Sequence, residues 1–116
     1  MAEARKRNGI LEAVTAKARE LNALIDYATD SVVSKTLVDK DPGTVTLFAF
    51  DAGQRLSEHT APFDALVQIV DGQAVITIAG NELNVSAGQV VIMPANIPHS
   101  VRGEVKFKML LTMIRA

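Results

Sequence analysis

The sequence predicts an all-β domain, a sandwich or barrel of short strands, preceded by a short N-terminal helical segment. After Tyr27, short runs rich in β-branched residues alternate with turn-forming residues at intervals of about ten, a pattern typical of such folds. Hydrophobic residues make up 48% of the chain and aromatic residues only 4%, so the expected core is aliphatic. The 116 residues contain no internal repeat, which indicates one domain.

The N-terminal part differs from the rest in its charge and in the spacing of its apolar residues, and we expect a tail and an amphipathic helix over residues 1–29. Residues 1–8 are charged and are expected to fray. A three-to-four spacing of apolar residues then predicts the helix, at Ile10, Val14, Ala18, Leu21 and Ile25. Such a helix would cap the open end of a barrel or pack on a neighbouring subunit.

The β-domain is expected over residues 30–116. Its predicted strands are residues 31–38, 44–50, 66–70, 74–79, 82–85, 89–93, 99–102 and 106–114. Asp71-Gly72 suits a type I′ hairpin turn, and Pro94 ends the strand before it. In the last strand Lys106 and Lys108 alternate with apolar residues, which should therefore face inward, namely Phe107, Met109, Leu111 and Met113.

Composition excludes several classes of function. A net charge of −1 gives no electrostatic reason to bind nucleic acid or an anionic membrane. The absence of cysteine excludes disulfides, thiolate ligands and a cysteine nucleophile. The sequence has no apolar run of membrane-spanning length and no signal-peptide pattern, so we expect a cytoplasmic protein.

Two glycine-framed segments each carry one of the two histidines of the chain. The first runs from Gly53 to Gly72 and contains His59, and the second starts at Gly88 and contains Pro94 and His99. This frame resembles the two motifs of a small single-domain cupin of the cupin 2 type. The resemblance implies a jelly-roll β-barrel of antiparallel strands, a pocket at its open end, and frequent homodimers.

The resemblance also implies a metal site that is incomplete here. In the cupin motifs two histidines and a glutamate of the first segment and one histidine of the second bind a metal. His59 and His99 occupy two of these positions, Ala61 and Ala65 occupy the other two, and Asn96 replaces a glycine of the second motif. His59 and His99 are thus the candidate metal ligands, and the expected cofactor is none or a weakly held divalent transition metal.

A third ligand is hard to name from the sequence. Glu58 and Asp64 are the nearest carboxylates, but each adjoins a residue expected to point inward, and neighbours on a strand face opposite sides. A one-residue bulge after Pro62-Phe63 would reverse this and bring Asp64 inward. Asn96 and Gln68 offer only weak carbonyl ligands.

The two alanines should leave a larger and more apolar pocket. Its expected ligand-binding residues are His59, Ala61, Ala65, Met93 and His99. Met109 and Met113 would join this wall, although methionines commonly serve as gap-fillers in a core.

Three functional hypotheses follow from this pocket, and whether the chain is an enzyme stays open. The first is a non-enzymatic cupin module that binds or senses a small molecule, with a second copy of the chain in a homodimer and a small-molecule ligand as its expected partners. The alternative is a metal-dependent oxygenase or isomerase that uses His59, His99 and an unidentified third ligand. The third is a metal-free epimerase or isomerase with one histidine as general base.

Overall fold

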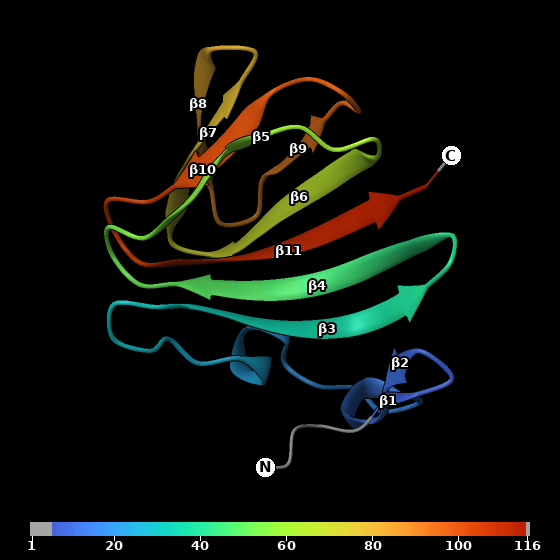
Figure 1. The fold of residues 1–116 in the computed structure, drawn as a ribbon. Helices are drawn as coiled ribbons and strands as arrows, with labels where there is room; N and C mark the ends of the chain where they lie inside the picture. The colour runs from blue at the N-terminus through green and yellow to red at the C-terminus, as the bar shows by residue number, and fades with distance from the viewer. Residues whose placement is uncertain (1–5, 116) are drawn as a thin grey trace.

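Two antiparallel β-sheets pack face to face in the computed structural model, which describes residues 6–115 (Figure 1). The larger sheet has the strand order β1 (Lys6–Arg7), β2 (Ile10–Leu11), β3 (Val32–Lys40), β4 (Gly43–Phe50), β11 (Phe107–Ile114), β6 (Asp64–Asp71) and β9 (Val90–Met93). The smaller sheet has the order β5 (Arg55–His59), β10 (His99–Arg102), β7 (Gln73–Ile78) and β8 (Asn81–Ser86). The all-β jelly-roll prediction is confirmed.

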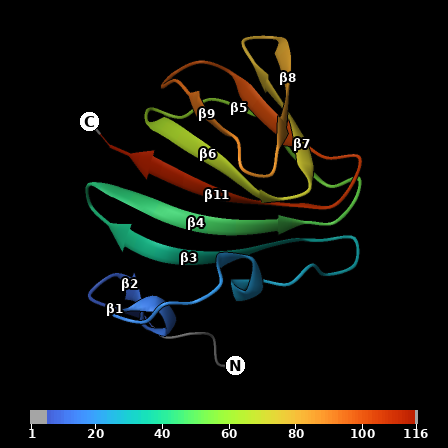
Figure 2. The same ribbon diagram turned by 180° about the vertical axis from the view of Figure 1, so that it is seen from behind.

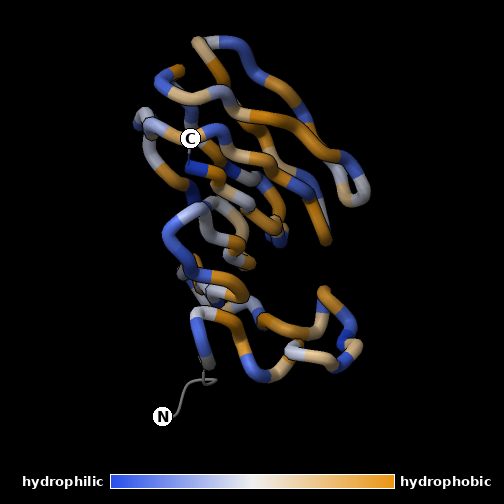
Figure 3. Tube along the Cα trace, turned by 90° about the vertical axis from the view of Figure 1, so that its right-hand side faces the viewer, coloured by the Kyte–Doolittle hydropathy of each residue, from blue (hydrophilic) through white to orange (hydrophobic). Residues whose placement is uncertain are grey.

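The core lies between the two sheets and follows the alternation of the strands. On β6, Ala65, Val67 and Ile69 are buried while Asp64 and Gln68 are exposed. Apolar and polar residues alternate in short stretches along the coloured trace of residues 6–115 (Figure 3). The apolar residues of β11 face inward as predicted, with Phe107 and Met109 fully buried and Leu111 and Met113 packed against the same core.

Two phenylalanines stack at the centre of this core. The rings of Phe50 and Phe107 lie 4.4 Å apart between centroids and 10° from parallel. Because Phe50 and Phe107 are also register partners on β4 and β11, the stack ties these two central strands together on the inner face. Gly103 lies against this stack, where an added Cβ would come within 2.4 Å of the Phe107 ring.

The predicted amphipathic helix over residues 10–25 is wrong. The described residues contain no α-helix; Ile10 and Leu11 form β2, and two short 3-10 turns follow, η1 (Glu12–Val14) and η2 (Leu21–Leu24). Ala16 has a positive φ of 57°, which no α-helix accommodates. An extended chain covers about twice the distance per residue of a helix, so these apolar side chains can spread across a sheet instead of lining one helical face.

Residues 12–27, here called the N-terminal strap, cover the outer face of the larger sheet (Figures 1 and 2). Ile25 is buried against Leu47 and Ala49 of β4, with Leu21 and Leu24 beside it. Apolar residues on the outside of β4 are thus covered by the chain itself. Farther along the same sheet, Val90 and Ile92 of the edge strand β9 stay exposed.

Two lysines of the sheet hold the strap through its main chain. Lys108 Nζ donates to the carbonyl oxygen of Asn22 over 2.6 Å, and Lys35 Nζ donates to that of Leu24 over 2.7 Å. Lys108 is only 6% exposed, although the alternation of β11 does direct it to the outer face. The strap therefore converts an outward lysine into a buried and hydrogen-bonded one.

Tyr27 ends the strap and joins it to the end of β6. Its hydroxyl donates to Asp71 Oδ2 over 2.6 Å, and the ammonium groups of Lys106 and Lys108 lie 4.8 and 4.9 Å from its ring centroid. Burial and the bond to Asp71 raise the pKa of the Tyr27 hydroxyl above its ordinary value, so the hydroxyl stays a donor.

The predicted hairpin at Asp71-Gly72 is also wrong. β6 belongs to the larger sheet and β7 to the smaller, so Gly72 marks the corner where the chain passes between sheets. The I′ conformation occurs instead at Ala79 and Gly80, between β7 and β8, where φ is 52° and 83°.

No helix in the described part of the chain is long and apolar enough to cross a membrane.

Replacing Gly72 by alanine should destabilise the fold far more than replacing Gly80. Both glycines have positive φ, which costs an alanine about 1 kcal/mol. At Gly72 the added Cβ would also lie 2.3 Å from the Lys106 carbonyl oxygen, whereas nothing lies within 4 Å at Gly80. In urea unfolding we expect a loss of about 1 kcal/mol for G80A and about 3 kcal/mol or more for G72A; equal losses would contradict the corner geometry.

Candidate functional site

A cavity of about 270 Å³ lies between the two sheets. Its lining comes from both sheets and consists of Phe48, Leu56, His59, Ala61, Ala65, Met93, His99, Val101, Met109, Leu111 and Met113. All five residues predicted to bind a ligand, and both methionines predicted to join them, meet in this one cavity. Sequence reasoning missed the hydrocarbon residues Phe48, Leu56, Val101 and Leu111. Strand alternation predicts that Leu111 faces inward, but it does not assign this residue to the pocket.

A β-bulge in β5 directs His59 into the cavity. His59 pairs with His99 and Leu56 pairs with Val101, so Ser57 and Glu58 together oppose a single residue of β10. Strict alternation from Leu56 would point Glu58 inward and His59 outward. The extra residue reverses the order, and Leu56 and His59 both line the cavity.

Neither candidate carboxylate reaches the cavity. The alternative bulge after Phe63 is not observed, because Asp64 and Ala65 continue in register with Ile114 and Met113 of β11. Asp64 is exposed and its Oδ1 accepts a hydrogen bond from the Ala95 amide over 2.9 Å. Glu58 lines a different hollow, on the outer face of the smaller sheet.

The two histidine rings contact each other at one side of the cavity. Their centroids are 4.4 Å apart and the ring planes meet at 71°, an edge-to-face arrangement. His99 is buried at 4% exposure, whereas His59 is exposed. The register of β5 and β10 sets this contact, since the two residues are direct cross-strand partners.

Each ring is oriented by a main-chain carbonyl two residues before it. His59 Nδ1 lies 2.7 Å from the Ser57 oxygen, and His99 Nδ1 lies 3.1 Å from the Ile97 oxygen. A carbonyl only accepts, so Nδ1 carries the proton in each neutral ring and Nε2 holds the lone pair. Every buried side-chain nitrogen or oxygen in the described residues has a partner, so the Nε2 atoms are open to the cavity or to solvent.

Burial keeps His99 neutral. Desolvation lowers the pKa of His99 below its ordinary value, and the neighbouring His59 lowers it further, against the opposing effect of the Ile97 carbonyl. At neutral pH the cavity therefore contains an uncharged His99 whose Nε2 accepts hydrogen bonds.

The donor set does not fit the divalent ion that the cupin motif implies. Among residues 6–115 no group of three or more histidine, cysteine, aspartate or glutamate side chains could hold a metal. Gln68 lies on the exposed face of β6 and Asn96 is not part of the cavity wall. Asn96 has a φ of 64°, which accounts for its place at a motif glycine, since asparagine tolerates this conformation.

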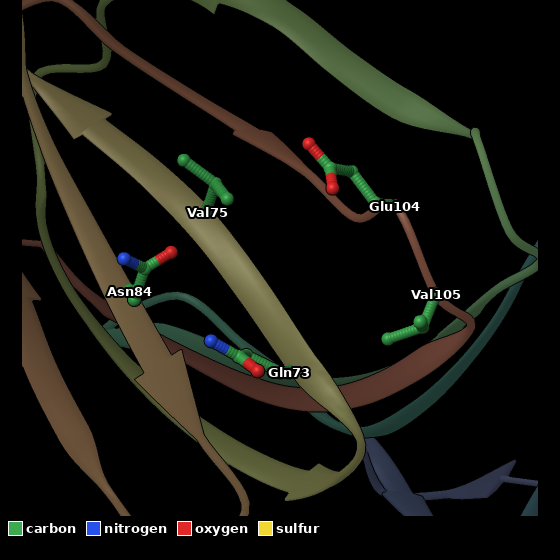
Figure 4. A pocket seen from close by; sticks show the side chains of 5 residues that line it. All are labelled: Gln73, Val75, Asn84, Glu104 and Val105. Atoms are coloured by element: carbon green, nitrogen blue, oxygen red, sulfur yellow. The ribbon is translucent and has the colours of Figure 1, made fainter.

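Other hollows among the described residues lack comparable chemistry. One, on the outer face of the smaller sheet, is lined by Gln73, Val75, Asn84, Glu104 and Val105 (Figure 4). Another lies beside the strap, where Leu21 meets β6 and β9. Neither contains a histidine, so the two-histidine cavity is the candidate site.

A two-sheet jelly roll with a histidine-bearing cavity between its sheets is the architecture of a cupin. Residues 46–114 match the family model described as a cupin domain. Since this match covers more than half of the 116 residues, the chain belongs to the cupin family.

Solved structures similar to the chain support the same assignment. A conserved protein of unknown function from Streptococcus pyogenes is 35% identical, with 97% of this chain and 96% of that chain covered and a TM-score of 0.86. A cupin superfamily protein from Desulfitobacterium hafniense is 30% identical, with 97% and 100% covered and a TM-score of 0.84. A cupin 2 conserved barrel domain protein from Leptotrichia buccalis is 37% identical over 81% of this chain and 46% of that chain, with a TM-score of 0.79. A search of curated proteins gave no match.

The lowered pKa of His99 gives the fold a specific acid sensitivity. Unfolding restores the ordinary pKa near 6.5, so the unfolded chain binds a proton at higher pH than the folded chain does. The free energy of unfolding should thus be insensitive to His99 above about pH 6.5 and should fall as the pH drops from about 6.5 to the lower pKa of the folded state.

Urea unfolding of wild type and H99Q between pH 7.5 and 5.5 measures this effect. We expect H99Q to lose less stability over this range than wild type does, because only wild type has a histidine held neutral by burial. Equal pH slopes for wild type and H99Q would show that His99 is not held neutral by burial.

Proposed function

We propose that this cupin is a binding module for a small, largely apolar organic molecule that carries one hydrogen-bond donor. The observation that carries the proposal is the cavity wall: hydrocarbon and thioether side chains throughout, with two imidazoles at one side. A pocket of this kind binds by apolar burial and orients its ligand through a few polar groups.

The polar groups define which end of the ligand faces the histidines. Nδ1 of both rings is occupied by a main-chain carbonyl, so the atom left to the ligand is Nε2, an acceptor. The O–H of a phenol or an alcohol, or an N–H group, matches such an acceptor. A neutral acceptor without a proton would instead leave the buried His99 unpaired.

The volume limits the size of the ligand. A cavity of about 270 Å³ equals the space of about nine water molecules in the liquid, at about 30 Å³ each. This suits a molecule of about ten non-hydrogen atoms. Ala61 and Ala65 supply part of this room, because the larger side chains of the family motif would project from the same positions.

The neutral cavity wall favours binding over metal-dependent catalysis in the form that the cupin motif implies. No carboxylate lines the cavity to balance a divalent charge, and none is placed to orient either imidazole as a general base. The imidazoles are held by carbonyl oxygens, which fix ring direction without supplying charge.

A matched pair of probes tests the proposal. p-Cresol and toluene have the same apolar shape and differ by one hydroxyl, so we expect p-cresol to bind about three to ten times more tightly, as one net hydrogen bond predicts. The methyl signals of Met93, Met109 and Met113 report occupancy in an NMR titration, because all three side chains line the cavity.

Three variants test where the probes bind and which group they contact. Ala65→Leu fills the cavity and should weaken both probes, whereas Val75→Leu, in the outer hollow of Figure 4, should change neither. His59→Leu should reduce the preference for p-cresol over toluene. Equal affinity of both probes for wild type, or methyl shifts that persist unchanged in A65L, would contradict the proposed mode of binding.

A further inference from the structure

The described residues of the chain bring their soft electron-pair donors together around one cavity. Residues 6–115 contain three methionines and two histidines, and all five side chains line the two-histidine cavity. The remaining lining side chains are hydrocarbon. The sulfur atoms of the three methionines therefore share one apolar cavity with the two imidazoles.

Strand register places two of the thioethers beside the position left empty by Ala65. Ala65 of β6 is the cross-strand partner of Met93 on β9 and also of Met113 on β11. Neighbouring strands are about 4.8 Å apart, so these methionines flank Ala65 from both sides and extend into the same cavity. The alanine methyl leaves the space between them open.

The histidines reach the cavity from the opposite sheet, at the same end of the barrel. His59 ends β5 and His99 begins β10, next to the loops that precede Ala65 and follow Met93. The Asn96 amide donates to the Ala61 carbonyl over 2.7 Å and holds these two loops together. Met109 lies four residues before Met113 on the same strand face, about 13 Å away along the strand.

We propose that this cavity binds one cuprous ion, Cu(I), through His59, His99 and the thioethers of Met93 and Met113. Thioether sulfur is a soft ligand that favours Cu(I), and imidazole suits copper as well as zinc, iron and nickel, whereas magnesium, calcium and manganese favour carboxylate or carbonyl oxygen. The thioethers, together with the absence of a charged ligand, point to Cu(I) rather than to a divalent ion. The hydrogen bond from each Nδ1 to a main-chain carbonyl leaves both Nε2 lone pairs free to bind a metal. Histidines that bind metals commonly have such a partner on the other ring nitrogen, which fixes the orientation of the ring.

The charge of the ion agrees with the charge of the wall. All four donors are neutral, and no lining residue is a carboxylate. The desolvation free energy of an ion rises with the square of its charge, so a monovalent ion pays roughly a quarter of the penalty of a divalent one of equal size. Methionine has three rotatable side-chain bonds, which lets its sulfur approach a bound ion without movement of the strands.

Anaerobic competition against a coloured Cu(I) chelator measures the proposed site. The wild-type chain should take up one Cu(I), and should bind Zn(II) and Ni(II) at least about a hundredfold more weakly. X-ray absorption of the loaded protein should show both nitrogen and sulfur neighbours of copper.

Leucine substitutions at the methionines separate ligands from gap-fillers, since leucine keeps the apolar volume. We expect Met93→Leu and Met113→Leu each to weaken Cu(I) binding about tenfold or more, and His59→Leu about a hundredfold. Val75→Leu, in the outer hollow of Figure 4 and away from the cavity, is the control and should retain wild-type affinity within about twofold. Circular dichroism and urea unfolding establish that each variant is folded.

Unchanged Cu(I) affinity in both M93L and M113L, an equal loss of affinity in V75L, or Zn(II) binding as tight as Cu(I) would overturn the proposal. It goes beyond the proposed function and shares with it only the open cavity. If Cu(I) fails to bind while p-cresol still shifts the methionine methyl signals, the copper site is refuted and the binding module stands. If p-cresol does not bind while Cu(I) does, the proposed binding module is refuted and the copper site stands.

Discussion

The cavity depends on one extra residue in β5. Leu56 must face the core and His59 must face the cavity, yet the two positions are three apart and a regular strand would send them to opposite sides. The bulge at Ser57 and Glu58 resolves this conflict. It also exchanges the residue that points inward, because a regular strand would bring the Glu58 carboxylate into the barrel in place of the His59 imidazole. The bulge in β5 thus both brings the His59 imidazole beside His99 and keeps the Glu58 carboxylate out of the cavity.

Much of the inner architecture could be predicted from the sequence because strand alternation repeats every second residue. Ala65, Val67 and Ile69 on β6 are buried as that rule requires, and the motif spacing was enough to bring His59, Ala61, Ala65, Met93 and His99 to one cavity. Alternation fails where a strand carries a bulge, and no residue type in Leu56-Ser57-Glu58-His59 marks the extra position.

The outer architecture was harder to predict, because a three-to-four spacing of apolar residues is ambiguous. The same side chains that predict a helix over residues 10–25 serve a strap of extended chain and 3-10 turns. What decides between these is the apolar outer face of β4, where Leu47 and Ala49 need a cover. The Asp71-Gly72 error is similar, because a glycine with positive φ suits both a hairpin and a corner between sheets.

The way in which the strap is attached determines which positions of the chain tolerate substitution. Lys35 and Lys108 donate to main-chain oxygens, which every amino acid possesses, so the exposed Asn22 can be exchanged freely without loss of its bond to Lys108. Neither lysine has the same freedom, since only a long cationic side chain reaches from the sheet to the strap. Substitutions in related chains should therefore accumulate in the strap at Asn22, while the two strand positions that hold it retain a basic residue.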